Sequence, residues 1–246
     1  MSIESERELE LLRIIGRIVR LALNAMAEAV APGVTTAELD TICARVLAAH
    51  GATSAPKLVY GFPGTSCISV NDEVVHGIPR NRVLCDGDLV KLDVTAEKDG
   101  FFADAAITVL VGEVSATAQS LARCAEAAFH QAMRVVRAGA RVHEIGLAVE
   151  RVVRSNGFSV VRELCGHGVG RTIHEEPTVP NYFDPRNRTR LTEGLVIAVE
   201  PIIAAGGGRS LLDRDGWTVR IADRSLAAHY EQTVVVTRHG PLLVTA

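Results

Sequence analysis

The sequence lacks the features of secreted, membrane-spanning and nucleic-acid-binding proteins. Its five cysteines are scattered and form no CxxC pair, which excludes a disulfide framework and fits reduced thiols. No apolar run approaches the roughly 18 residues of a membrane span, and the Glu-rich start does not look like a signal peptide. The net charge of -3 gives no basic footprint for DNA. We therefore expect a cytoplasmic protein that binds neither membranes nor DNA.

Three familiar catalytic motifs are also missing. The sequence has no HExxH segment, which excludes the commonest zinc-protease arrangement. The glycines at 206–208 are not followed by the Lys-Ser/Thr of a phosphate-binding loop, and the residues around Ser66 lack the glycine that would complete a nucleophile elbow. Any catalysis must therefore depend on other residues.

Local patterns predict helices followed by strands. Ser5 with Glu8 forms a capping signature ahead of apolar residues at helical spacing, and Thr35 with Glu38 opens a second such segment. From about 58 to 110, Val, Ile and Thr become frequent and turn residues punctuate them, which predicts strands and hairpins.

The same order of elements recurs later in the chain. An offset of 106 residues superposes Gly33 on Gly139, Glu38 on Glu144, Leu39 on Ile145 and Gly51 on Gly157. With 48% hydrophobic content and no long linker, 246 residues suit one domain, 1–246, built from halves of approximately 1–112 and 113–246. We expect an α+β (mixed α/β) fold with its active site where the halves meet.

Two aspartates interrupt apolar strands in the first half. Asp93 and Asp104 flank a turn at Lys98–Gly100, so a hairpin places them on one face, with the loop length deciding whether they pair directly. An exposed edge position is the ordinary role of a strand aspartate. Apolar neighbours on both strands instead favour a carboxylate pair that shares a cation.

Two glutamates and two histidines show the same pattern in the second half. Glu200 and Glu231 lie in apolar, strand-like runs, where an unpaired carboxylate is costly. His167 and His174 stand in ELCGHGVGRTIHEEP, whose glycines let the backbone approach a ligand closely, so the segment looks built around an ion rather than around packing. Three arginines could neutralise the glutamates instead: Arg171, Arg220 and Arg224. A common metal ligand set is the more economical interpretation, and four carboxylates with His167 suit two divalent ions.

These motifs, taken together, resemble a known family. In order and spacing, the chain is similar to the type I methionine aminopeptidases through YGFPGTSCISVNDEVVHGIP, the aspartate hairpin, GHGVGRTIHEEP, AVEP and YEQTVVVT. The resemblance implies the pita-bread fold, with two pseudo-symmetric halves around a curved, mainly antiparallel sheet, in the short bacterial form. It also implies two divalent ions, Co, Mn, Fe or Zn. One ion would be held by Asp93, Asp104 and Glu231, and the other by Asp104, His167, Glu200 and Glu231.

The resemblance further implies a reaction and its partners. A hydroxide bound by the two metals would attack the first peptide bond of a nascent polypeptide and remove its N-terminal methionine when the next residue is small. Glu200 would relay the proton, His174 would stabilise the oxyanion and His76 would contact the scissile amide nitrogen. We expect a monomer in transient contact with the ribosome.

By the same resemblance, Phe62, Cys67 and Trp217 should line the methionine pocket, although Trp217 could equally be a core anchor. The chain departs from many relatives at Val59, where tyrosine is common, and at Ile173, where an aromatic residue is frequent. Both changes predict a differently shaped pocket. The four remaining histidines that we considered are expected at the surface or in caps: His50, His130, His143 and His239.

Three alternatives stay open. Xaa-Pro aminopeptidases and prolidases share the fold and ligands but usually carry an extra N-terminal domain. Type II methionine aminopeptidases carry a helical insertion for which the stretch between His174 and Glu200 has no room. A metal-free binding protein that reuses the fold would be expected to lose ligands, whereas all five are present.

Overall fold

The computed structural model describes residues 1–246 as five helices and fifteen strands. The helices are α1 (Glu6–Glu28), α2 (Thr36–Ala49), α3 (Ala55–Tyr60), α4 (Ala116–Met133) and α5 (Val142–Ser155). The strands are β1 (Thr53–Ser54), β2 (Cys67–Val70), β3 (Glu73–Val75), β4 (Leu89–Lys98), β5 (Phe101–Leu110), β6 (Ser159–Val160), β7 (Cys165–Gly168), β8 (Glu175–Pro180), β9 (Val196–Val199), β10 (Ile202–Ala204), β11 (Ser210–Leu212), β12 (Val219–Ile221), β13 (Ala227–His229), β14 (Glu231–Thr237) and β15 (Gly240–Leu243).

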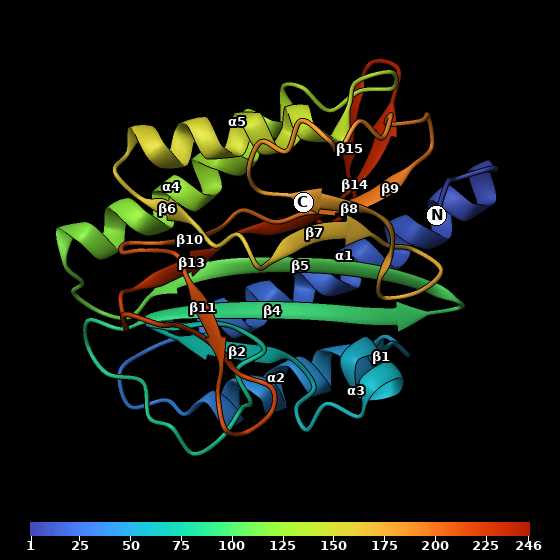
Figure 1. Ribbon diagram of the computed structural model, residues 1–246. Helices are drawn as coiled ribbons and strands as arrows, with labels where there is room; N and C mark the ends of the chain where they lie inside the picture. The colour runs from blue at the N-terminus through green and yellow to red at the C-terminus, as the bar shows by residue number, and fades with distance from the viewer.

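A nine-stranded antiparallel sheet runs through the whole molecule. Its main path is β1-β4-β5-β14-β9-β7-β8, with β2 paired to β4 and β15 paired to β14 (Figure 1). The first half meets the second where β5 pairs with β14. Two three-stranded sheets, β13-β10-β6 and β11-β12-β3, complete the fold.

Each half of the sheet has its own pair of helices and its own core. Apolar residues of α1 and α2, including Leu12, Ile15 and Leu39, pack with β4 and β5 residues such as Leu92, and α1 passes behind these strands in Figure 1. A second core joins α4 and α5 to β9 and β14, around Phe129. The apolar faces of the helices are thus used to cover the sheet. None of the helices combines the length and the apolar character needed to cross a membrane.

The 106-residue offset found in the sequence also relates helices and strands of the first half to those of the second half. It carries α2 onto α5 residue for residue and β1 onto β6. Gly33 and its equivalent Gly139 have nearly the same left-handed φ, 94° and 92°. Both second helices also use the glutamate at their third position to accept from the capping backbone amide, Glu38 at Thr35 and Glu144 at Arg141.

One segment of the first half differs from the expectation. We predicted strands and hairpins from about residue 58, but residues 55–60 form the short helix α3. Pro56 stands in the first helical turn and Gly61 adopts the left-handed conformation that ends a helix, with φ 69°. These two residues outweigh the strand preference of Val59, and α3 places Tyr60 at the cavity described below.

Candidate metal centre and active site

The aspartates lie on one face of the β4–β5 hairpin but are not directly paired. Asp93 stands opposite Ala106, and Asp104 stands opposite Thr95. The two carboxylates are therefore diagonal neighbours across the ladder. Ala106 also stands opposite Glu231 of β14, so a row across three strands reads Asp93, Ala106, Glu231. The small central side chain leaves space in front of the sheet between the two acids.

Adjacent strands bring the remaining predicted ligands to the same place. Glu200 follows β9, and His167 lies on β7, which pairs with β9. The Nε2 atom of His167 is 3.6 Å from a Glu200 oxygen and 3.9 Å from an Asp104 oxygen. Asp104, His167 and Glu231 offer ligand atoms that all lie within 4.8 Å of one another.

The arginines that could have neutralised the glutamates are used elsewhere. Arg171 pairs with Glu8, and Arg224 pairs with Asp72. Arg220 pairs with three carboxylates: Asp72, Glu73 and Asp213. The alternative that an arginine satisfies Glu200 or Glu231 is therefore wrong.

Electrostatics and hydrogen bonding make this cluster suitable for cations. Burial, together with the neighbouring carboxylates, raises the pKa values of Asp93, Glu200 and Glu231 well above their ordinary range. Burial also raises the pKa of Asp104 to about 6. One oxygen of Asp104 and one of Glu231 are buried without any hydrogen-bond partner. Buried acceptors without donors need either protons or metal ions, and oxygen with imidazole donors suits divalent transition metals.

His167 has the hydrogen bonding of a metal ligand. Its Nδ1 lies 2.8 Å from the carbonyl oxygen of Gly168, which can accept the Nδ1–H proton and leaves the Nε2 lone pair facing the acids. Burial lowers the pKa of His167, which favours the neutral, ligating form.

His174 and His76 lie beside the cluster and line the cavity. The rings of His167 and His174 are 4.3 Å apart in an edge-to-face arrangement. The Tyr60 hydroxyl lies 2.6 Å from Nδ1 of His174. His76 follows β3 in a left-handed conformation, φ 57°, which is uncommon for residues other than glycine and is typical of functional positions. Burial lowers the pKa of both His76 and His174, so both rings are neutral near pH 7.

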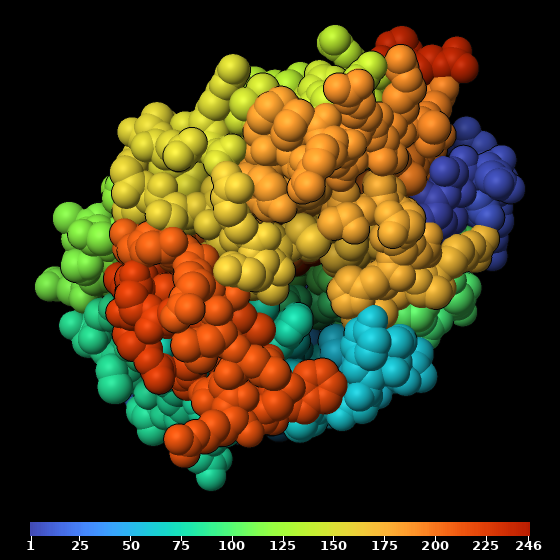
Figure 2. All heavy atoms as spheres, in the orientation of Figure 1, coloured from blue at the N-terminus to red at the C-terminus, as the bar shows by residue number.

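A cavity of about 830 Å³ opens onto these residues. Figure 2 shows its mouth between α3, the segment around residues 165–178 and the loop before β12. Phe62 and Trp217 line it in an edge-to-face pair with ring centroids 5.2 Å apart. Cys67, opposite Asp93 on β2, also lines it, and burial holds its thiol pKa well above the ordinary range. The three predicted pocket residues therefore line the same cavity as the acids.

The two departures from the usual sequence differ in their consequences. Ile173 is 4% exposed and lines the cavity, so its aliphatic side chain does shape the pocket. Val59 is 45% exposed and is not among the lining residues, whereas its neighbour Tyr60 is. The expectation that Val59 changes the pocket directly is therefore wrong, because α3 turns Val59 outward.

The glycines around His167 serve packing and not the approach of a ligand. A Cβ on Gly166 would lie 2.4 Å from the Ala198 carbonyl oxygen, and one on Gly168 would lie 2.2 Å from the Glu176 carbonyl oxygen. Any side chain there would force β7 away from β9 and β8. Our interpretation of these glycines was wrong, although the conclusion about His167 did not depend on it.

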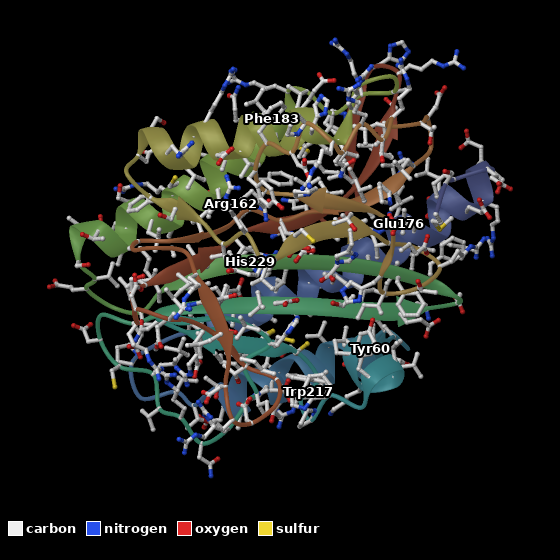
Figure 3. The ribbon with its side chains drawn as sticks, in the orientation of Figure 1. Tyr60, Arg162, Glu176, Phe183, Trp217 and His229 are labelled. Carbon is white, nitrogen blue, oxygen red and sulfur yellow. The ribbon has the colours of Figure 1, made fainter.

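Sequence reasoning missed one histidine of the site. His229, which lies near the middle of the molecule in Figure 3, is 2% exposed and lines the cavity. Its Nε2 lies 3.4 Å from a Glu231 oxygen and 3.7 Å from a Glu200 oxygen. Its position two residues before Glu231, in an apolar run, was the available signal. The four other histidines lie outside the cavity lining, with His50 as the C-cap of α2: His50, His130, His143 and His239.

The fold and the cavity together define a metal-dependent hydrolase built from two related halves. The chain belongs to metallopeptidase family M24, whose sequence profile matches residues 10–238. It is 44% identical to methionine aminopeptidase 2 of Bacillus subtilis (strain 168), over 100% of this chain and 99% of that protein. It is 40% identical to the methionine aminopeptidase of Escherichia coli (strain K12), over 100% of this chain and 94% of that one.

Solved structures agree with this assignment. The methionine aminopeptidase of Thermotoga maritima superposes with a TM-score of 0.96 and 34% identity, over 100% of this chain and 99% of that chain. The prolidase of Pyrococcus furiosus has a TM-score of 0.80 at 22% identity and shares the fold over 65% of its chain. The pita-bread fold and the resemblance to type I methionine aminopeptidases are confirmed. The chain is a metal-dependent aminopeptidase.

Proposed function

We propose that this enzyme removes the N-terminal methionine from nascent polypeptides when the second residue is small. The observation that carries the proposal is that the buried acids and the Phe62–Trp217 pair line the same cavity. An unbranched thioether side chain fits an aromatic wall through sulfur–aromatic contact. The peptide bond next to that side chain then lies over the acids.

The donor set supports two divalent ions. Asp93, Asp104 and Glu231 would hold one ion, and Asp104, His167, Glu200 and Glu231 would hold the other, so that Asp104 and Glu231 bridge. The unpartnered oxygens of Asp104 and Glu231 and the diagonal placement of Asp93 and Asp104 support this division. A pair of divalent ions supplies polarisation of the scissile carbonyl and activation of a water molecule.

The surrounding side chains bind, orient and move protons. Glu200, which lines the cavity beside His167, would take a proton and pass it to the leaving amine. His174 donates from Nε2 to the developing oxyanion, because its Nδ1 faces the Tyr60 hydroxyl. His76, which also lines the cavity, would contact the scissile amide nitrogen. We further propose that residues 1–246 act as one catalytic domain.

A peptide assay tests the function. The purified protein, stripped of metal and then supplied separately with Co, Mn, Fe or Zn, should release methionine from Met-Ala-Ser. It should spare Ala-Pro peptides, which a prolyl peptidase of the same fold would cleave. Failure of every metal to support methionine release would overturn the proposal, and cleavage of Ala-Pro alone would assign the chain to the prolyl group.

A further inference from the structure

His229 is the one imidazole of the centre without an assigned role, and the structure fixes its position firmly. Its backbone amide donates to the Thr108 hydroxyl at 3.0 Å, and that hydroxyl donates to its carbonyl oxygen at 2.8 Å. β13 also holds it opposite Ile202 of β10. The ring is therefore held at the inner wall of the site by β5 and β10, strands that belong to different halves.

Both nitrogens of this buried ring lack a hydrogen-bond partner within the chain. Nε2 faces two carboxylate oxygens, Oε2 of Glu231 at 3.4 Å and Oε2 of Glu200 at 3.7 Å. A buried polar group without a partner costs free energy, so Nε2, which faces these oxygens, must gain a partner when the centre is complete. Two arrangements would satisfy it: coordination of a metal through Nε2, or donation of Nε2–H to the carboxylates.

Only one carboxylate oxygen of each of Glu200 and Glu231 faces His229. Oε1 of Glu200 faces His167 at 3.6 Å, whereas Oε2 faces His229 at 3.7 Å. Oε1 of Glu231 has no partner, whereas Oε2 faces His229. Each glutamate thus presents one oxygen to His229 and keeps the other available for an ion.

The second ring nitrogen decides between the two arrangements. A metal-bound imidazole almost always donates its other N–H to an acceptor, as His167 can to Gly168. His229 has no acceptor at Nδ1, so coordination through Nε2 would bury an unsatisfied N–H. If Nε2–H donates instead, Nδ1 carries no proton, and the ring keeps only an acceptor lone pair without a partner. Orphaned buried N–H groups are rarer in proteins than under-satisfied acceptors.

We propose that His229 is a positioning residue of the metal centre, donating Nε2–H to Oε2 of Glu231, the nearer of the two carboxylate oxygens that it faces, while His167 is the single imidazole ligand. This inference rests on the proposed function of the centre. The donated hydrogen bond orients Glu231 so that its other oxygen faces the ions. Loss of such an outer partner typically weakens metal binding about 10–100-fold.

Nitrogen NMR of the zinc-loaded, 15N-histidine-labelled wild-type enzyme tests the assignment directly. One metal-bound imidazole is expected, together with a ring that is protonated at Nε2, bare at Nδ1 and absent from the His229→Gln spectrum. A second metal-bound imidazole that disappears in His229→Gln would overturn the proposal. This measurement does not depend on His229→Leu, the variant that lacks the hydrogen-bond donor and could fail to fold.

Zinc affinity of variants supplies the second test. His229→Leu should bind zinc about 10–100-fold more weakly than wild type, whereas His229→Gln, whose amide can still donate, should stay near wild type. His130→Gln, on the exposed face of α4, is the matched control. Equal zinc affinity of wild type and a folded His229→Leu would overturn this inference alone. If wild type bound no zinc or other divalent metal, the proposed function would fail with it.

Discussion

The Tyr60 hydroxyl and Nδ1 of His174 lie 2.6 Å apart, although 114 residues separate them in the chain. Tyr60 reaches His174 from the end of α3, and the two rings stand 5.8 Å apart. Because the phenol is the better donor at neutral pH, it fixes the His174 tautomer with its proton on Nε2. A hydrogen bond between side chains of opposite cavity walls thus prepares the proposed oxyanion donor.

Tyr60→Phe is expected to lower kcat about 3- to 10-fold and to leave KM nearly unchanged, since one neutral hydrogen bond contributes about 0.5–1.5 kcal/mol. The loss falls on kcat because His174 acts on charge that develops during the reaction. Steady-state kinetics with Met-Ala-Ser would show the effect. Tyr182→Phe, which changes a tyrosine outside the cavity lining, is the control. An unchanged kcat in Tyr60→Phe would contradict the role of this hydrogen bond.

Asp104→Asn is expected to abolish both metal binding and turnover. The substitution keeps the shape of the side chain but removes the charge that would bridge two ions, so neither ion keeps its full ligand set. Metal content after dialysis and methionine release should fall together. Asp99→Asn, in the turn of the same hairpin with φ 52°, is a suitable control because asparagine tolerates this conformation. Retained turnover in Asp104→Asn would disprove the bridging assignment.

The sequence was sufficient for the features that depend on local pattern. Capping residues such as Thr35 predicted helix starts, and the apolar flanks of Asp104 and Glu231 correctly predicted buried acids. Features that depend on contacts between residues far apart in the chain could not be predicted from the sequence. The role of Gly168 depends on the Glu176 backbone across a strand pair, and the orphaned ring of His229 becomes evident only once Glu200 is beside it.

Metal removal should make the stability of the protein depend on pH in a defined direction. The pKa of Asp104 is about 6 in the fold and ordinarily 3.8, so the folded metal-free chain binds more protons than the unfolded chain between these values. Asp104 therefore contributes a fall in stability as pH rises, which the buried histidines oppose below their ordinary pKa of 6.5, because burial lowers their pKa values. Glu200 and Glu231, with raised pKa values, extend the fall to higher pH.

Thermal unfolding of the chelator-treated protein at about pH 7 and about pH 8, where the histidines are largely neutral in both the folded and the unfolded chain, would measure the carboxylate contribution. A lower Tm is expected at the higher pH, and added divalent metal should restore it by replacing the protons with bound cations. Metal-free Asp104→Asn should show a weaker dependence, because it lacks one of the titrating groups. A metal-free wild type whose Tm rises across the window would contradict the carboxylate burial described above.

Trp217→Leu tests whether the only tryptophan is a pocket wall or a core anchor. As a pocket wall, its loss should lower kcat/KM for Met-Ala-Ser about 10-fold or more, mainly through KM, and should weaken discrimination against Leu-Ala-Ser. The acids and His174 stay in place, so kcat should change little. Phe183→Leu, at a ring that is 40% exposed and packs against His143, serves as the control. A lower Tm with unchanged KM and an unchanged preference for methionine would instead make Trp217 a structural anchor, leaving Phe62 and Ile173 to recognise the side chain.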